Sequence, residues 1–324
     1  MVVMNIVQAI NSALKQEMER DETVLVLGED VAVDGGVFRV TDGLYSKFGR
    51  ERVIDTPLSE SAIVGTSVGL AIAGFKPVAE IQFDGFMYPA FDQLINHAAR
   101  IRTRSRGNYH CQMVLRAPYG GGIHGPEHHS ESMEAIYAHT PGLKVVIPST
   151  PFDAKGLLVS SIRDPDPVIF LEPKRVYRAI KQEVPEKLYT TELGKASVVQ
   201  QGTDITLVSW GAMMKACLEA VSNLKETASI ELIDVRTISP LDGETIISSV
   251  KKTGRCVVVQ EAPKSFGPAS EIIAQINDRA LTSLDAPVER LTGFDVPIPL
   301  YKLENYYLPN AKRIENAIRR VLLH

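Results

Sequence analysis

The residues best suited to chemistry near neutral pH in this chain are its histidines, and three of the seven lie in one short loop. The segment Tyr119–Ser130 contains His124, His128 and His129 among four glycines and one proline. Such a composition excludes a regular helix or strand, and glycine costs backbone entropy unless tight geometry requires it. Imidazoles on this loop can transfer protons, contact anions or bind a metal ion. A polar surface loop without function is the simpler alternative.

Glu60 is a second candidate, because it lies where a helix is expected to begin. Pro57 ends the preceding extended stretch, and Ser59 or Ser61 is suited to cap the helix. Residues 62–74 carry no charge and many small side chains, so we expect this helix to be buried or packed closely against another. A carboxylate at the mouth of a buried helix loses water and is then able to hold a proton. The alternative is a carboxylate that only balances the helix dipole.

A third segment, Glu80–Gln93, is rich in aromatic residues and runs from an expected strand into an expected helix. Phe83, Phe86, Tyr88 and Phe91 are of the type that usually fills a core. A flat side chain on a strand-to-helix loop is also able to stack on a heterocyclic ligand.

Runs rich in β-branched residues alternate with helical patterns over most of the chain, which predicts a two-domain α/β protein with mainly parallel sheets flanked by helices. Active sites in such sheets lie beyond the carboxyl ends of the strands, where the three segments above are expected to gather. The expected strands of the first half are Thr23–Leu27, Pro77–Gln82, Gln112–Leu115, Lys144–Ile147 and Val168–Leu171, and the expected helices are Ser61–Ala73, Tyr88–Arg104 and Pro151–Arg163.

The pattern breaks from Glu172 to about Gly194, which indicates a connection between domains. We therefore expect a first domain over residues 1–185, a linker over 186–197 and a smaller second domain over 198–324, since 324 residues are too many for one simple core. The second domain should contain strands Ile205–Ser209, Ile230–Val235, Cys256–Gln260 and Val288–Thr292, and helices Met213–Lys225, Gly243–Val250, Ala269–Ala280 and Ala311–Leu323.

Composition excludes several classes of protein. A net charge of −4 favours neither nucleic acid nor an anionic membrane, and no apolar run is long enough to span a bilayer. The three cysteines are scattered, which favours a reducing compartment. Since residues 1–5 begin no signal or transit peptide, we expect a cytoplasmic protein, or a mitochondrial one if the source is eukaryotic. No phosphate-binding GxxxxGK[ST] or GxGxxG motif is present.

These segments together resemble one family over essentially the whole chain, the β subunits of thiamine-diphosphate-dependent 2-oxo acid dehydrogenases. That resemblance implies a transketolase-like fold, with a pyrimidine-binding domain followed by a smaller C-terminal domain. Besides the three segments, it rests on Gly28–Val31, Gly35–Phe38, Pro141–Val146, Asp153–Leu157, Phe170–Lys174 and Asp234–Thr237.

The resemblance also implies roles for single residues. The family's activating glutamate falls on Glu60, which would contact N1′ of the aminopyrimidine ring of thiamine diphosphate and help to remove the thiazolium C2 proton. Its stacking aromatic residue falls on Phe86. Gln82 and the backbone of Leu58 fall where the family lines the pyrimidine pocket.

The family's active-site histidine falls on His129, which the resemblance places in acyl transfer to the lipoyl arm of a dihydrolipoyl acyltransferase. His128 and His124 match less closely. A structural potassium site of the family would fall near Asp164 and Asp166, for which an ordinary helix-to-strand turn is the alternative.

One part of the cofactor site is missing from the sequence. Mg²⁺ and the diphosphate need a Gly-Asp-Gly segment with a downstream Asn pair, and the chain has only Val33-Asp34-Gly35 and Thr41-Asp42-Gly43. The cofactor must then be shared with another chain, and the resemblance implies an α subunit that holds Mg²⁺ in a heterotetramer of two α and two β chains. The small-residue helix after Glu60 is a candidate packing surface for that assembly.

The substrate is the least determined part of this prediction. Residues 117–120, 128–134 and 173–175 favour branched-chain 2-oxo acids, with pyruvate dehydrogenase and acetoin dehydrogenase as alternatives. From different classes of protein, a histidine-metal enzyme and a non-catalytic assembly subunit remain as further alternatives.

Overall fold

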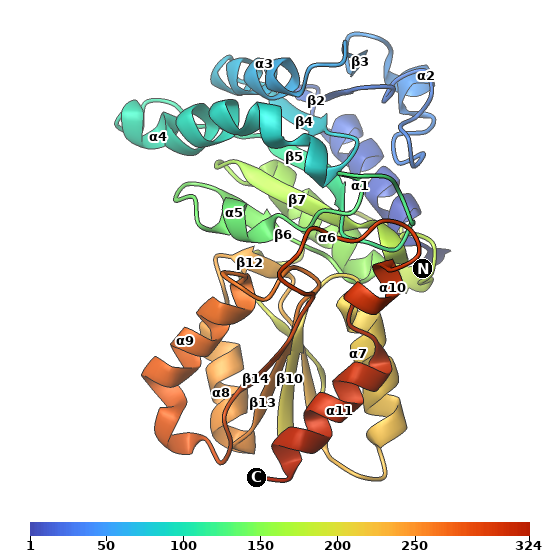
Figure 1. Cartoon of the computed structure of the whole chain (residues 1–324). Helices are drawn as coiled ribbons and strands as arrows, with labels where there is room; N and C mark the ends of the chain where they lie inside the picture. The colour runs from blue at the N-terminus through green and yellow to red at the C-terminus, as the bar shows by residue number, and fades with distance from the viewer.

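The structure is a computed structural model that describes residues 1–324 and contains three sheets with helices packed around them (Figure 1). The first sheet has the order β12-β6-β7-β5-β4-β2-β3, and all its pairs are parallel except β12–β6. The second has the order β14-β13-β10-β11-β9, parallel except for β9. The predicted α/β class with two domains and mainly parallel sheets is confirmed.

The elements have the following bounds. The first sheet and its helices comprise α1 (Ile6–Arg20), β2 (Val24–Gly28), α2 (Leu44–Phe48), β3 (Val53–Asp55), α3 (Glu60–Ile72), β4 (Lys76–Glu80), α4 (Ile101–Arg104), β5 (Val114–Tyr119), α5 (Glu134–Ala138), β6 (Lys144–Val146), α6 (Pro151–Arg163) and β7 (Val168–Pro173), with β1 (Val2–Met4) and β8 (Gln182–Val184) as a separate antiparallel pair. The second part comprises β9 (Ser197–Gln200), β10 (Ile205–Ser209), α7 (Met213–Leu224), β11 (Ile230–Asp234), β12 (Thr237–Ser239), α8 (Gly243–Thr253), β13 (Cys256–Val259), α9 (Pro268–Ala280), β14 (Glu289–Leu291), α10 (Glu304–Tyr307) and α11 (Ala311–Leu322).

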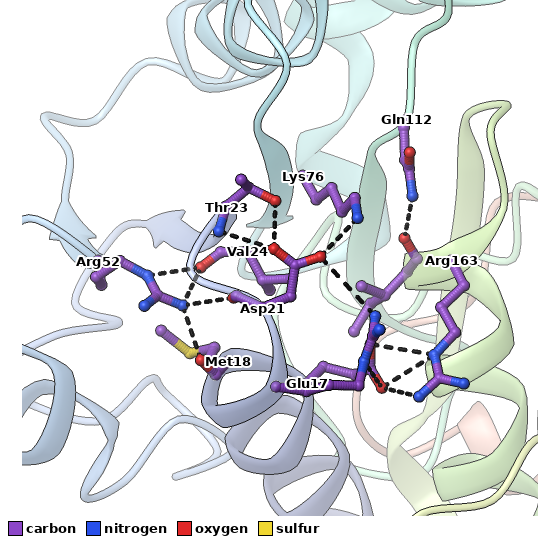
Figure 2. A network of polar contacts seen from close by, with 11 residues as sticks. Glu17, Met18, Asp21, Thr23, Val24, Arg52, Lys76, Gln112 and Arg163 are labelled. Carbon is purple, nitrogen blue, oxygen red and sulfur yellow. Dashed lines mark hydrogen bonds and ion pairs between the residues drawn. The ribbon is translucent and has the colours of Figure 1, made fainter.

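Helix α1 is an element that the sequence prediction omitted, although its beginning carries a readable signal. Asn5 and Gln8 form a capping box, in which each side chain accepts a hydrogen bond from the other residue's backbone N–H, at 2.9 and 3.0 Å. The buried face of α1 packs against α6. Figure 2 shows the contacts at its carboxyl-terminal end. The fully buried Glu17 carboxylate accepts a hydrogen bond from Arg163 of α6, and the Asp21 carboxylate accepts one from Lys76 of β4 at 2.6 Å.

The predicted helix Tyr88–Arg104 is wrong as one regular helix. Residues Tyr88–Ala90 form a 3₁₀ turn, Asp92–His97 a π-helix, Ala98–Arg100 another 3₁₀ turn, and only Ile101–Arg104 is α-helical. Pro89 has no N–H to donate, which fits the short opening turn. Each change of helix type rotates the side chains that follow, and such π segments are frequent beside functional sites.

The break in pattern after Glu172 is not the start of an interdomain connection. The side chain of Glu172 is fully buried at the end of β7, and β8 pairs with β1 in a register that places Val184 opposite Val2. Two charged side chains of this stretch, Glu172 and Lys174, are buried within the first domain. Residues 185–196 form no helix or strand, but Tyr189 stacks on Phe152 of α6 with ring centroids 4.7 Å apart. The domain boundaries stay predictions.

The two parts of the chain share a sheet edge. Strand β12 follows β11 in sequence but pairs antiparallel with β6 of the first sheet, with Thr237 opposite Val146. Next to it, Arg236 donates to the Asp153 carboxylate of α6 at 2.9 Å. Figure 1 shows β12 at the junction between the upper and lower parts of the molecule. The second domain is therefore fixed to the first through backbone pairing and an ion pair.

A buried ion cluster joins the three central strands of the first sheet. Arg116 of β5 donates to the carboxylates of Glu80 in β4 at 2.7 Å and Glu172 in β7 at 2.6 Å. All three side chains are almost completely buried. Burial disfavours charge on Arg116, yet the carboxylates of Glu172 and Glu80 raise its pKa above the usual value. The cluster is therefore an arginine that two acids keep charged inside the sheet.

Replacing this arginine should destabilise the chain strongly. Arg116→Met leaves two buried carboxylates without their common cation, which should lower the free energy of unfolding by about 3–5 kcal/mol in urea titrations. Arg279→Met is the control, because Arg279 pairs with Glu244 at the surface, and its loss should cost about 1 kcal/mol or less. Equal losses for the two variants would contradict the structural role of the cluster.

Candidate functional site

Glu60 lies at a carboxylate-rich edge of the first sheet. It is the first residue of α3 and is half-buried, and Ser59 at the N-cap makes no side-chain hydrogen bond to the helix. Burial raises the pKa of Glu29, which follows β2, and the charges of Glu60 and Asp30 raise it further. Gln82 donates to the Asp30 carboxylate at 3.1 Å. The ends of β2 and β4 and the start of α3 therefore bring Glu60 and Gln82 to one neighbourhood, although no direct contact joins them.

Helix α3 is only half covered in this chain. Ile63, Val64 and Val68 on one face are buried, whereas Ala62 and Thr66 on the opposite face are exposed. The expected buried helix is thus found on one side only, and the other side presents small residues to the exterior.

Phe86 and His129 lie together. Their ring centroids are 5.0 Å apart. The Phe83 ring contacts both of them, with its centroid 4.4 Å from that of His129 and 5.3 Å from that of Phe86. Phe83 is buried, whereas Phe86 and His129 are half-buried and so remain partly accessible. The Ser61 hydroxyl of α3 donates to the Pro89 carbonyl, which ties the start of the Glu60 helix to the aromatic segment.

The three histidines of the loop point to different neighbours. His124 Nδ1 lies 2.8 Å from the Tyr301 carbonyl of the second domain. The His128 ring lies 5.9 Å from the Tyr88 ring, and His129 Nδ1 lies 2.9 Å from the Glu127 carbonyl. No group of three His, Cys, Asp or Glu side chains in the chain is placed to hold a metal ion. The geometry therefore gives no support to the histidine-metal alternative.

Asp84 is a residue of this region that sequence reasoning missed. Its carboxylate is almost fully buried and accepts hydrogen bonds from Met133 N at 2.9 Å and Tyr137 Oη at 2.7 Å. Burial raises the pKa of Asp84 to about 6, and the hydrogen bonds from Tyr137 and Met133 oppose that rise. Asp84 and Phe86 belong to the same 3₁₀ turn. Through Asp84, this turn is bound to Met133 and Tyr137, which follow the histidine loop in sequence. Its position among aromatic residues was the only sequence signal for it.

For three predicted residues, Leu58, Asp164 and Asp166, the structure gives less support. The Leu58 side chain is 79% exposed, and the prediction for this residue concerns its backbone alone. At the turn before β7, Asp164 pairs with Lys144 and Asp166 with Arg102 at 2.6 Å. Cationic side chains therefore engage both carboxylates. The potassium site stays a prediction.

A cavity of about 1050 Å³ in the chain does not include the candidate site. It lies between α5 and β12 on one side and α9 on the other, with His139 and Phe266 among its lining residues. None of Glu60, Phe86 and His129 lines it.

Comparison with known proteins accounts for both parts of the chain. Residues 3–180 match the pyrimidine-binding domain of transketolase, and residues 194–314 match the transketolase C-terminal domain. At the level of fold, the chain is similar to a solved structure described as a split-gene transketolase, inactive beta4 tetramer, with a TM-score of 0.81, 21% identity and coverage of 99% of this chain and 98% of that one.

Curated relatives are much closer in sequence. The pyruvate dehydrogenase E1 component subunit beta of Acholeplasma laidlawii is 55% identical over 322 residues, which cover 99% of this chain and 98% of the relative. The protein of the same name from Bacillus subtilis (strain 168) is 52% identical over 323 residues, which cover 99% of each chain. The matched length in each case spans both domains of this chain.

Proposed function

We propose that this chain, which belongs to the family of thiamine-diphosphate-dependent 2-oxo acid dehydrogenase β subunits, acts on pyruvate together with its α subunit. The observation that carries the proposal is the contact of Phe86 with His129 beside the start of the Glu60 helix, which the Ser61–Pro89 hydrogen bond ties to the aromatic segment of the pyrimidine-binding domain. The names of the curated relatives support pyruvate as the substrate.

This substrate differs from the branched-chain 2-oxo acids that the sequence favoured, and the relatives support the alternative instead. Part of the earlier inference rested on residues 173–175. In the structure Lys174 is buried, and its Nζ donates to the Gly120 carbonyl. A lysine used to hold backbone in this way carries little information about the length of a substrate side chain.

The residues of this edge fit the aminopyrimidine end of thiamine diphosphate. Glu60 offers a carboxylate that can hold or share a proton at the ring nitrogen, in a neighbourhood where burial and nearby acids already favour protonation of Glu29. Phe86 offers a partly exposed ring face and Gln82 an amide, which suit binding and orientation of a flat polar heterocycle. When bound, the cofactor would supply the electron sink for decarboxylation.

His129 is suited to a later proton transfer. Its ring packs on Phe83 and Phe86 at the mouth of the site and stays half-buried, so it can meet both the site and an incoming partner. We assign to it proton transfer during passage of the acyl group to the lipoyl arm of a dihydrolipoyl acyltransferase.

The sequence supports the proposed assembly. It lacks the Gly-Asp-Gly segment and Asn pair that the family uses for Mg²⁺, so we assign Mg²⁺ and the diphosphate end to the α subunit. The exposed small-residue face of α3 begins at Glu60, and we propose that it packs in a heterotetramer of two α and two β chains. No helix is long and apolar enough to cross a membrane. Since the curated relatives are bacterial, we propose a cytoplasmic enzyme.

Glu60→Gln tests the proton-holding role. The variant keeps the size of the side chain but cannot relay a proton, so the activity of the assembled enzyme should fall by about 10²–10⁴-fold. Cofactor binding, measured by calorimetry, should persist, and exchange of the cofactor C2 hydrogen should slow in parallel. Glu22→Gln, an exposed glutamate before β2, is the control and should behave as wild type. Normal C2 exchange in Glu60→Gln would remove Glu60 from this role.

Competition between substrates tests the pyruvate assignment. The α and β chains should be assembled with thiamine diphosphate and Mg²⁺ and offered pyruvate mixed with 3-methyl-2-oxobutanoate or acetoin. A pocket fitted to pyruvate should favour it by about 10- to 200-fold in kcat/KM over the branched acid. Preference for either competitor would overturn the substrate while leaving the family unchanged.

His129→Ala separates the two halves of the reaction. Acyl transfer to lipoyl should fall by about 10²–10⁴-fold, whereas decarboxylation read with an artificial electron acceptor should be largely retained. His124→Ala, whose ring faces Tyr301 rather than Phe86, is the matched control and should change either rate little. Equal losses in both assays for His129→Ala would place this residue in decarboxylation instead.

A further inference from the structure

We propose that two buried carboxylates of the second domain, Glu261 and Glu304, act as positioning residues for the histidine loop by accepting the backbone N–H groups of Gly121 and Gly122. This inference rests on the proposed function and deepens it, because it gives the second domain a part in acyl transfer by His129.

The two glutamates reach the loop from different elements. Glu261 follows β13, and Glu304 is the first residue of α10, which lies near the junction of the two domains in Figure 1. Their exposures are 2% and 1%. Burying a carboxylate is costly unless hydrogen bonds or charges compensate for lost water. The consecutive N–H groups of Gly121 and Gly122 supply part of that compensation, so the loop and the second domain stabilise each other.

This contact gives a physical reason for the glycine run that the sequence left unexplained. A Cβ on Gly120 would lie 2.6 Å from Glu261 Oε1, and one on Gly121 would lie 3.0 Å from Glu304 Oε1. A side chain at Gly120 would collide with Glu261, and one at Gly121 would be tight against Glu304. The glycines are therefore required by the close approach of the second domain, in addition to any need for flexibility.

Lys174 completes the arrangement from the first domain. Its buried ammonium donates to the Gly120 carbonyl, so the backbone of the loop is held by acids at its N–H groups and by a cation at a C=O group. Burial lowers the pKa of Lys174 to about 8, and Glu261 is the largest influence opposing that change. Burial raises the pKa of Glu261, and the Gly121 N–H and Lys174 oppose it.

The far end of the loop is fixed separately, so His129 lies between two anchors. Gly120 N donates to the Glu131 carbonyl at 2.7 Å, which closes the base of the loop. Beyond it, Met133 N is bound by Asp84. Loss of the contacts to Glu261 and Glu304 would free the first half of the loop and let the His129 imidazole sample a wider range of positions against Phe86.

The test uses the β chain assembled with its α subunit, thiamine diphosphate and Mg²⁺. In Glu261→Ala and Glu304→Ala, hydrogen–deuterium exchange of residues 119–130 should accelerate. Acyl transfer to lipoyl should fall by about 10- to 100-fold, since small misplacement of a catalytic group has effects of this size. Decarboxylation with an artificial acceptor should stay near the wild-type rate. Glu304→Gln retains an acceptor oxygen and should restore most of the transfer rate.

Glu231→Ala is the matched control. Glu231 is a buried carboxylate of the same domain that also accepts a glycine N–H, from Gly202 at 3.4 Å, and pairs with Lys252, but it does not touch the loop. Its loss should leave exchange of residues 119–130 unchanged. Gly121→Ala is a second variant, which crowds the Glu304 carboxylate with a Cβ and removes no charge, and it should change loop exchange and acyl transfer in the same direction as Glu304→Ala.

Unchanged loop exchange in Glu261→Ala, Glu304→Ala and Gly121→Ala would overturn the proposal, as would equal losses in both activity assays. Failure of the proposed function gives a different result. If His129→Ala leaves acyl transfer intact, the role of His129 is wrong, while loop exchange in the glutamate variants still decides whether the second domain holds the loop.

Discussion

The buried pairing of Arg116 with Glu80 and Glu172 is the interaction from which the rest of the site extends. It joins three neighbouring strands near their carboxyl ends, where α/β sheets place their active sites. The Tyr177 hydroxyl donates a hydrogen bond of 2.5 Å to the Glu172 carboxylate. The Tyr177 and Phe38 ring centroids are 5.3 Å apart, those of Phe38 and Phe83 are 5.6 Å apart, and Phe83 packs on His129. A continuous series of packed groups therefore runs from the interior of the sheet to the histidine loop.

Much of the architecture follows from local sequence pattern. Strand β10 has the predicted bounds, and the predicted helix Pro151–Arg163 coincides with α6, because apolar periodicity and the Thr150 cap act over a few residues. Residues of the candidate site were identified through resemblance; the structure places the Phe86 and His129 rings 5.0 Å apart, and their roles stay predictions. The irregular helices after Tyr88 could not be foreseen, since a π-turn leaves no simple period in the sequence.

A single sequence could not predict the contacts that buried charged residues make with residues far away in the chain. Gly121 and Glu261 are 140 positions apart, and Gly122 and Glu304 are 182 apart. In sequence each of these glutamates resembles an ordinary surface acid, and Glu172 and Lys174 resemble the polar residues of a linker. Only the fold shows that their charges are buried and paired.

The relation between the two domains is therefore part of the site. A buried set of charges such as Lys174, Glu261 and Glu304 is weak evidence for stability, because desolvation offsets much of the attraction between the groups. Its effect on geometry is more direct, since acids from the second domain and a lysine from the first bind successive backbone groups of one loop. Strand β12 and the Arg236–Asp153 pair fix the orientation of the domains against each other. With that orientation fixed, the second domain determines where the loop of the first can present His129.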